Sequence, residues 1–117
     1  MLLRPSATCT KIDVLFGRGG LTNNHHGNAR FRAVAAQLRP AYKATTSKTV
    51  KRQISKHLMN MMKKEGARFL RRNSDGPNYY VVDDIVAIDK SSQAIREDPD
   101  VTRVRRENKK AAKGQSL

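Results

Sequence analysis

One stretch links a short apolar run to a helical pattern: Asp13-Val14-Leu15-Phe16-Gly17-Arg18-Gly19-Gly20-Leu21-Thr22-Asn23-Asn24-His25-His26-Gly27-Asn28. It contains four glycines, three asparagines, two histidines and one arginine. Glycine admits backbone conformations with positive φ, and asparagine caps helices and tolerates left-handed geometry. We therefore expect a polar loop between a strand at residues 12–16 and a helix.

This loop is also a candidate anion site. A helix N-terminus points unpaired backbone N–H groups at whatever precedes it, which favours an anion. The chain carries a net charge of +14, so phosphate is the expected anion. The predicted phosphate-binding loop consists of Gly17, Arg18, Gly19, Gly20, Asn23, Asn24, His25 and Asn28. The equally supported alternative is a structural loop whose side chains tie strand to helix through hydrogen bonds to the backbone.

Two familiar nucleotide motifs are excluded. Thr22 stands where G-x-G-x-x-G needs its third glycine, and the chain has no G-K-[ST] sequence.

The first helix is predicted to begin at Asn28, which occupies an N-cap position. Pro40 should end or kink this helix near Arg39, although Tyr42 fits a continuation after a bend. The apolar stripe that defines its buried face is Phe31, Val34, Ala35 and Leu38.

A second helix is predicted over residues 48–65, with a cap in residues 45–47 and a stop at Gly66. Its buried face should consist of Val50, Ile54, Leu58, Met61 and Met62. Cations cluster around the other side, with no acid before Glu65: Lys48, Lys51, Arg52, Lys56 and Lys63. Because surface helices usually mix charges to gain i,i+4 pairs, this pattern favours an anionic partner.

Residues 68–71 and 79–82 read as two strands of a hairpin around a turn-rich segment. A third helix should follow over residues 85–96, capped by Asp83 or Asp84, with an inner stripe of Ile85, Ile88, Ser92 and Ile95. The fold class is therefore α+β, a small domain of three helices and one hairpin. A helix followed by a hairpin is also the order of a winged helix. We expect a flexible leader at 1–11, the domain at 12–97 and a basic disordered tail at 98–117.

Residues 1–60 hold eleven Lys and Arg against one acid, which suggests a polyanionic partner. We expect a nucleic-acid-binding, DNA-directed regulatory module. The residues expected to contact nucleic acid are Lys48, Lys51, Arg52, Lys56, Arg68, Arg71 and Arg72. The alternative is a protein-interaction module that recognises an acidic or phosphorylated segment. The oligomeric state is left open.

Other function classes find little support. Cys9 is the only cysteine, and the three histidines do not have metal-ligand spacing, so we expect no metal, no cofactor and no enzymatic activity. No apolar run is long enough to span a bilayer, so no membrane partner is expected. A lone cysteine fits a reducing compartment. We expect the nucleus, with a basic tail segment at 103–113 as an import signal, and the cytosol as the alternative.

Three ordered motifs carry a resemblance. The first is residues 13–20 (DVLFGRGG) with 22–25 (TNNH) and 27–28 (GN); the second is 66–70 (GARFL); the third is 90–97 (KSSQAIRE). Together they resemble an uncharacterised domain family of diatoms and related stramenopile algae, domain of unknown function 6824. Small departures from its pattern are Ala67 for glycine, Tyr79-Tyr80 for tryptophan and Ile95 for leucine. The resemblance implies domain limits near 12–97 and no known activity.

Overall fold

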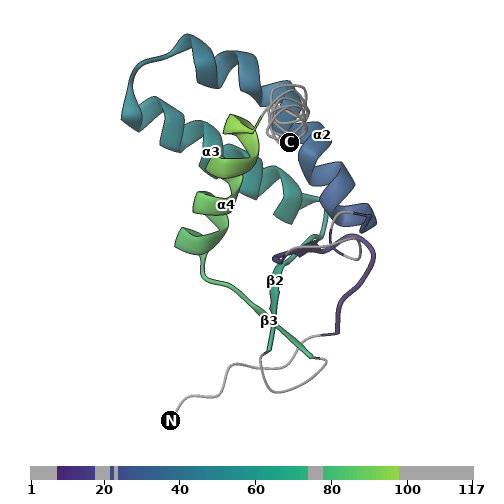
Figure 1. Ribbon diagram of the computed structural model, residues 1–117. Coiled ribbons are helices and arrows are strands. Elements are labelled where there is room, and N and C mark those ends of the chain that lie inside the picture. Colours follow the sequence, from purple (N-terminus) through teal and green to yellow (C-terminus); the bar gives the residue numbers. More distant parts are fainter. Residues whose placement is uncertain (1–7, 18–21, 23, 74–77, 98–117) are drawn as a thin grey trace, which may run out of the picture.

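The computed structural model describes residues 8–17, 22, 24–73 and 78–97. The described elements are, in chain order, β1 (Val14–Leu15), α2 (His26–Ala44), α3 (Lys48–Lys64), β2 (Phe69–Arg72), β3 (Tyr79–Val81) and α4 (Asp84–Arg96). Helices α2 and α3 run in opposite directions, α4 lies across them, and the small sheet sits at the end where α2 begins (Figure 1). The α+β class predicted from the sequence is confirmed. The residues of the expected tail, 98–117, and residues 1–7 of the expected leader lie outside the described residues.

The sheet has three strands in the order β1-β2-β3. Strands β2 and β3 form the predicted antiparallel hairpin, with Leu70 opposite Val81. Strand β1 adds to the other edge of β2 in parallel, with Val14 opposite Phe69. The strand predicted at 12–16 is therefore present but only two residues long. The parallel pairing was not predicted, because it joins segments 55 residues apart in sequence.

Helix α2 begins at His26, so the prediction that Asn28 is its N-cap was wrong. Asn28 lies in the first turn, is 4% exposed, and pairs with the backbone of β1. Its Oδ1 accepts the Leu15 N–H at 2.7 Å, and its Nδ2 donates to the Leu15 carbonyl at 2.9 Å. The amide side chain thus gives Leu15 the two hydrogen bonds that a neighbouring strand would supply.

Pro40 does not end α2, which continues to Ala44. A proline inside a helix loses one backbone hydrogen bond and destabilises by about 3 kcal/mol. The continuation brings Tyr42 into the core at 8% exposure, and burying an aromatic side chain offsets much of that loss. The position of Tyr42 in the sequence had left this continuation open as an alternative.

Helix α3 has nearly its predicted bounds, and the Ser47 Oγ caps it by accepting the Val50 N–H at 3.2 Å. Its buried face differs from the prediction. Leu58 and Met62 are buried as expected, but Val50 is 38% exposed. The buried residues that complete the face are Ser55 and Met59.

The buried face of helix α4 also differs from its predicted inner stripe. Ile88 and Ile95 are buried as predicted, whereas Ile85 is 65% exposed and Ser91 is fully buried. Where α3 and α4 meet, the Ser92 Oγ donates to the Ser55 Oγ at 2.6 Å. Hydrogen-bonded serines let the two helices approach closely, a contact that an apolar-stripe pattern cannot reveal.

The C-terminal end of α4 is held by α2. The Arg39 guanidinium donates to the carbonyls of Ile95 (2.8 Å), Ala94 (3.3 Å) and Glu97 (2.6 Å). These carbonyls have no amide donor within their own helix, so Arg39 acts as a side-chain cap.

The core lies between the three helices and one face of the sheet. Phe31 of α2 meets Phe69 of β2 edge to face, with ring centroids 5.6 Å apart. Leu58, Met59 and Met62 of α3 complete this centre, each 2% exposed or less.

The start of α2 presses directly on the chain before β1. The Gly27 N–H donates to the Lys11 carbonyl at 2.7 Å. A Cβ at position 27 would lie 2.0 Å from the Asp13 carbonyl oxygen and 2.6 Å from that of Ile12. Both clashes are with backbone atoms, so only glycine fits here.

Gly27→Ala is expected to reduce the free energy of unfolding by about 3 kcal/mol or more, because the backbone of residues 12–13 must move. Urea denaturation at pH 7 measures the change. Ala36→Gly, at an exposed position of the same helix, should lose only about 1 kcal/mol. Equal small losses in both variants would contradict the close approach.

Candidate nucleic-acid interface

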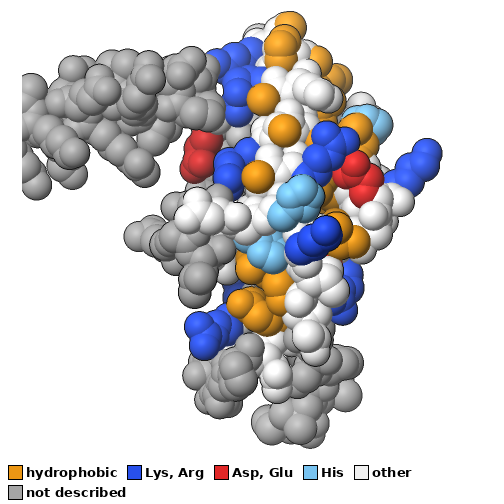
Figure 2. Space-filling model, turned by 90° about the vertical axis from the view of Figure 1, so that its right-hand side faces the viewer, with side chains coloured by type: hydrophobic (Ala, Val, Ile, Leu, Met, Phe, Trp, Pro, Cys, Tyr) orange, Lys and Arg blue, Asp and Glu red, His pale blue; other side chains and the backbone are white. Residues whose placement is uncertain are grey.

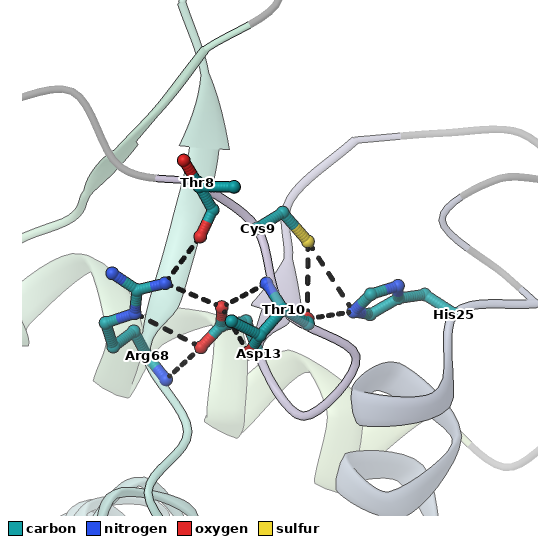
Figure 3. A network of polar contacts seen from close by, with 6 residues as sticks. All are labelled: Thr8, Cys9, Thr10, Asp13, His25 and Arg68. Carbon is teal, nitrogen blue, oxygen red and sulfur yellow. Dashed lines mark hydrogen bonds and ion pairs between the residues drawn. The ribbon is translucent and has the colours of Figure 1, made fainter.

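Arg68, one of the predicted nucleic-acid contacts, lies in a network around the buried carboxylate of Asp13 (Figure 3). Asp13 is 1% exposed. Its oxygens accept the backbone N–H and hydroxyl of Thr10 at 2.8 and 2.9 Å, and the backbone N–H and Nη2 of Arg68, both at 2.9 Å. The Arg68 Nη2 also donates to the Thr8 carbonyl at 2.7 Å. Residues 8–13 are therefore tied to the start of the hairpin.

The electrostatics of this network indicate a structural role for Arg68. Burial alone would raise the pKa of Asp13, but the hydrogen bonds from Arg68 and Thr10 outweigh it and hold the pKa below its ordinary value. The same pairing raises the pKa of Arg68. Because the guanidinium neutralises a buried charge, it contributes little free positive charge to a surface.

Cys9 and His25 lie beside this network but do not form a nucleophile and base. The His25 Nε2 is 3.1 Å from the Thr10 carbonyl, which only accepts, so this nitrogen carries a proton. The Cys9 thiol, 3.8 Å from the same nitrogen, donates to the same carbonyl at 3.4 Å. Burial and the charge of Asp13 raise the pKa of Cys9, with Arg68 acting in the opposite direction. The thiol is therefore not activated.

The predicted phosphate-binding loop is only partly described. Gly17 has a φ of +129°, a conformation that glycine adopts readily. Asn24 is exposed, while His25 and Asn28 bond to the backbone of Thr10 and Leu15. The contacts of His25 and Asn28 are those of the alternative interpretation, a structural loop whose side chains form hydrogen bonds to the backbone. The predicted members Arg18, Gly19, Gly20 and Asn23 lie outside the described residues, so their phosphate role stays a prediction.

A basic groove lies where the start of α3 meets the ends of α2 and α4. It has a volume of about 500 Å³ and is lined by Tyr42, Lys48, Lys51, Arg52, Asp89, Ser92 and Arg96. We name it the α3 groove. The Lys51 Nζ lies 5.3 Å from the centroid of the Tyr42 ring, so a cation–π contact positions this ammonium at the wall.

The α3 groove has a strong excess of positive charge. Four of its lining residues are cations and one, Asp89, is an acid. The closest approach of Asp89 to Arg52 is 3.9 Å, in a pair whose side chains are 69% and 57% exposed, and such pairs contribute little. The first turn of α3 contains no acid, so the positive end of the helix dipole adds to the potential. Lys56, one turn beyond Arg52 and exposed, extends the row of cations.

A second group of cations surrounds Phe16, which follows β1. The Arg71 Cζ lies 4.9 Å and the Lys90 Nζ 4.6 Å from the centroid of its ring. We name these three residues the Phe16 cluster. Lys90 follows Asp89 directly, and successive helical residues point about 100° apart. Helix α4 therefore lies between the α3 groove and the Phe16 cluster.

The predicted contact residues thus divide into two sets. Lys48, Lys51 and Arg52 line one groove, with Lys56 next to them on the same helix. The hairpin residues do not join this surface: Arg68 pairs with Asp13, and Arg71 contacts Phe16. Arg72 is exposed at the end of β2. No single patch of all seven residues forms.

The face over α2 is not a continuous basic surface. In Figure 2, Lys and Arg side chains on this face lie apart from one another, among hydrophobic and histidine side chains, and acidic atoms lie beside some of them. Arg30 of α2 pairs with Glu65 at 2.8 Å. The concentration of cations in the α3 groove is therefore not repeated over α2.

Sequence reasoning did not identify six residues of these sites. Four of them line the α3 groove (Tyr42, Asp89, Ser92 and Arg96), and two belong to the Phe16 cluster (Phe16 and Lys90). Lys90 opens the third motif of the family resemblance, which was the one available signal. Arg96 and Tyr42 reach the groove only through the packing of α2 and α4 against α3.

Two absences apply to the described part of the chain. Those residues contain no group of three or more His, Cys, Asp or Glu side chains arranged to hold a metal ion. They also contain no helix that is both long and apolar enough to cross a bilayer.

Asp13→Asn is expected to reduce the free energy of unfolding at pH 7 by about 2–3 kcal/mol, because Arg68 loses its charged partner. The lowered pKa of Asp13 means that its stabilisation is complete above the unfolded pKa of about 4 and is lost as the pH falls through the folded pKa. Urea denaturation at pH 7 and pH 2.5 should therefore show a smaller gap between variant and wild type in acid. A difference in stability between Asp13→Asn and wild type that does not change with pH would contradict the ion pair. The control variant is Asp89→Asn, which removes an exposed carboxylate and should change the free energy of unfolding by less than about 1 kcal/mol.

No curated protein and no solved structure matches this chain. A family model, described as Domain of unknown function (DUF6824), matches residues 13–97. That span contains all six helices and strands named above. The chain is therefore a member of the DUF6824 domain family.

Proposed function

We propose that this domain binds nucleic acid through the α3 groove. The observation that carries the proposal is the gathering of Lys48, Lys51, Arg52 and Arg96, from two helices, around one open groove with a single acid. Lysine and arginine contacts to phosphates provide most of the affinity of such interfaces and little of their sequence preference.

The groove suits a phosphate backbone better than a single small anion. It is open and about 500 Å³ in volume, and Lys56 continues the row of its α3 cations, which begins at Lys48. Eight residues of helix cover about 12 Å, a length that spans several phosphates of one strand. The proposed role is regulatory binding of DNA in the nucleus.

The alternative function is a protein-interaction module for an acidic or phosphorylated segment. The same cations support it, since arginine and lysine clusters also recognise phosphorylated peptides. The two functions differ in how affinity depends on salt and in the ligand that binds most tightly.

Lys51→Glu with Arg52→Glu is expected to weaken duplex DNA binding by about 100-fold at 100 mM salt, because two phosphate contacts become repulsive. Titrations at several salt concentrations measure both affinity and its salt dependence. Four contacts in the wild type predict a log–log slope of about −3.6, and the double variant should fall to about −1.8. Single-stranded RNA and an acidic phosphopeptide are titrated in parallel.

The matched control is Lys11→Glu with Lys64→Glu, which makes the same change in net charge with two exposed residues. Lys64 lies 12 residues from Arg52 on α3, about 18 Å along the helix, and should leave binding nearly unchanged. An equal loss of DNA affinity in both double variants would mean that the change in net charge alone accounts for the effect. Flat, weak binding to every nucleic acid together with tight binding of the phosphopeptide would support the alternative.

A further inference from the structure

The geometry points to a second, separate ligand site: the Phe16 cluster binds one phosphate group of a small molecule, with Lys90 at its base and Arg71 at its rim. This goes beyond the proposed function, since neither residue lines the α3 groove.

Three elements distant in sequence build this site. Phe16 follows β1, Arg71 belongs to β2 and Lys90 to α4. Both cations lie within 5 Å of the same ring centroid, at 4.9 and 4.6 Å. The Lys90 Nζ is also 6.0 Å from the centroid of Phe31. The fold thus holds an ammonium and a guanidinium around one aromatic side chain.

This arrangement is electrostatically unfavourable as it stands. Lys90 is half-buried, and burial lowers its pKa; Glu97 opposes this effect, while the positive charges of Arg32 and Arg71 lower the pKa further. No ion pair of the described residues joins a carboxylate to Lys90 or Arg71. Contacts with an aromatic ring compensate a cation only in part. An anion between the two side chains would neutralise both charges.

The residue types fit phosphate. The arginine fork binds two phosphate oxygens at once, and lysine adds a point charge. Lys90 is half-buried and Arg71 is exposed, and both lie against the same Phe16 ring. A half-buried lysine and an exposed arginine against one ring suit one tetrahedral anion, in contrast to the extended row of cations on α3.

The test follows the Lys90 side-chain Cε–Hε signal by NMR while sodium phosphate replaces sodium chloride at constant ionic strength. We expect a saturable change at millimolar phosphate and a rise in Tm of about 5 °C at ten times the Kd. Lys90→Met keeps the aliphatic volume, removes the charge, and should abolish the phosphate-dependent rise. The matched control Lys48→Met, in the α3 groove, should retain it.

Adenosine monophosphate is the second probe. Tighter binding than inorganic phosphate identifies an organic phosphate as the ligand, and equal binding identifies the free anion. If Lys90→Met does not fold, Arg71→Gln, at an exposed position, makes the same test. The proposal is overturned if the Lys90 signal does not change with phosphate. It is also overturned if the variant that removes the charge, Lys90→Met or Arg71→Gln, keeps the full phosphate-dependent rise in Tm.

The proposed phosphate site and the proposed nucleic-acid site can be tested independently of each other. Lys90→Met should bind duplex DNA with wild-type affinity, and Lys51→Glu with Arg52→Glu should keep the phosphate-dependent rise in Tm. Loss of DNA binding on removal of Lys90 would show one continuous surface and contradict a separate site.

Discussion

The carboxylate of Asp13 fixes the position of the N-terminal segment relative to the hairpin. Burying a carboxylate is unfavourable unless donors surround it, and Thr10 and Arg68 supply five of them. This arrangement sets β1 beside β2, and the start of α2 then packs against the same segment through Gly27 and Asn28. Phe16 directly follows β1, and its backbone N–H donates to the Leu70 carbonyl of β2 at 2.8 Å, so its position depends on how β1 is held. The Phe16 cluster therefore depends on a carboxylate that takes no direct part in it.

Helix α4 separates two groups of cations among the described residues. On one side, Arg96 joins the cations of α3 around an open groove. On the other, Lys90 is half-buried next to Phe16 and Arg71. Exposed cations in an open groove are suited to a polymer of phosphates, because each contact is weak and many add up. A half-buried lysine and an arginine against one ring favour a single well-positioned anion.

Features that depend on neighbouring residues could be predicted from the sequence. The bounds of α3 follow from the Ser47 cap and the stop at Gly66, and the hairpin follows from two short strands around turn residues. Asn28 was assigned as a cap because that is its usual local role, whereas its amide serves Leu15. The pairing of Asp13 with Arg68 spans 55 residues, so no local pattern reveals that this arginine is already engaged. For the same reason, the row of cations on α3 could be predicted, because a single helix supplies it. The Phe16 cluster could not be predicted, because three elements distant in sequence build it.

The cap that Arg39 places on α4 has a mechanical consequence. A helix end normally frays, so a segment attached to it pivots freely. Here three terminal carbonyls are held by a side chain from the middle of α2. Unwinding the last turn of α4 would therefore also break these contacts with α2. The C-terminal end of α4 is thus mechanically coupled to α2.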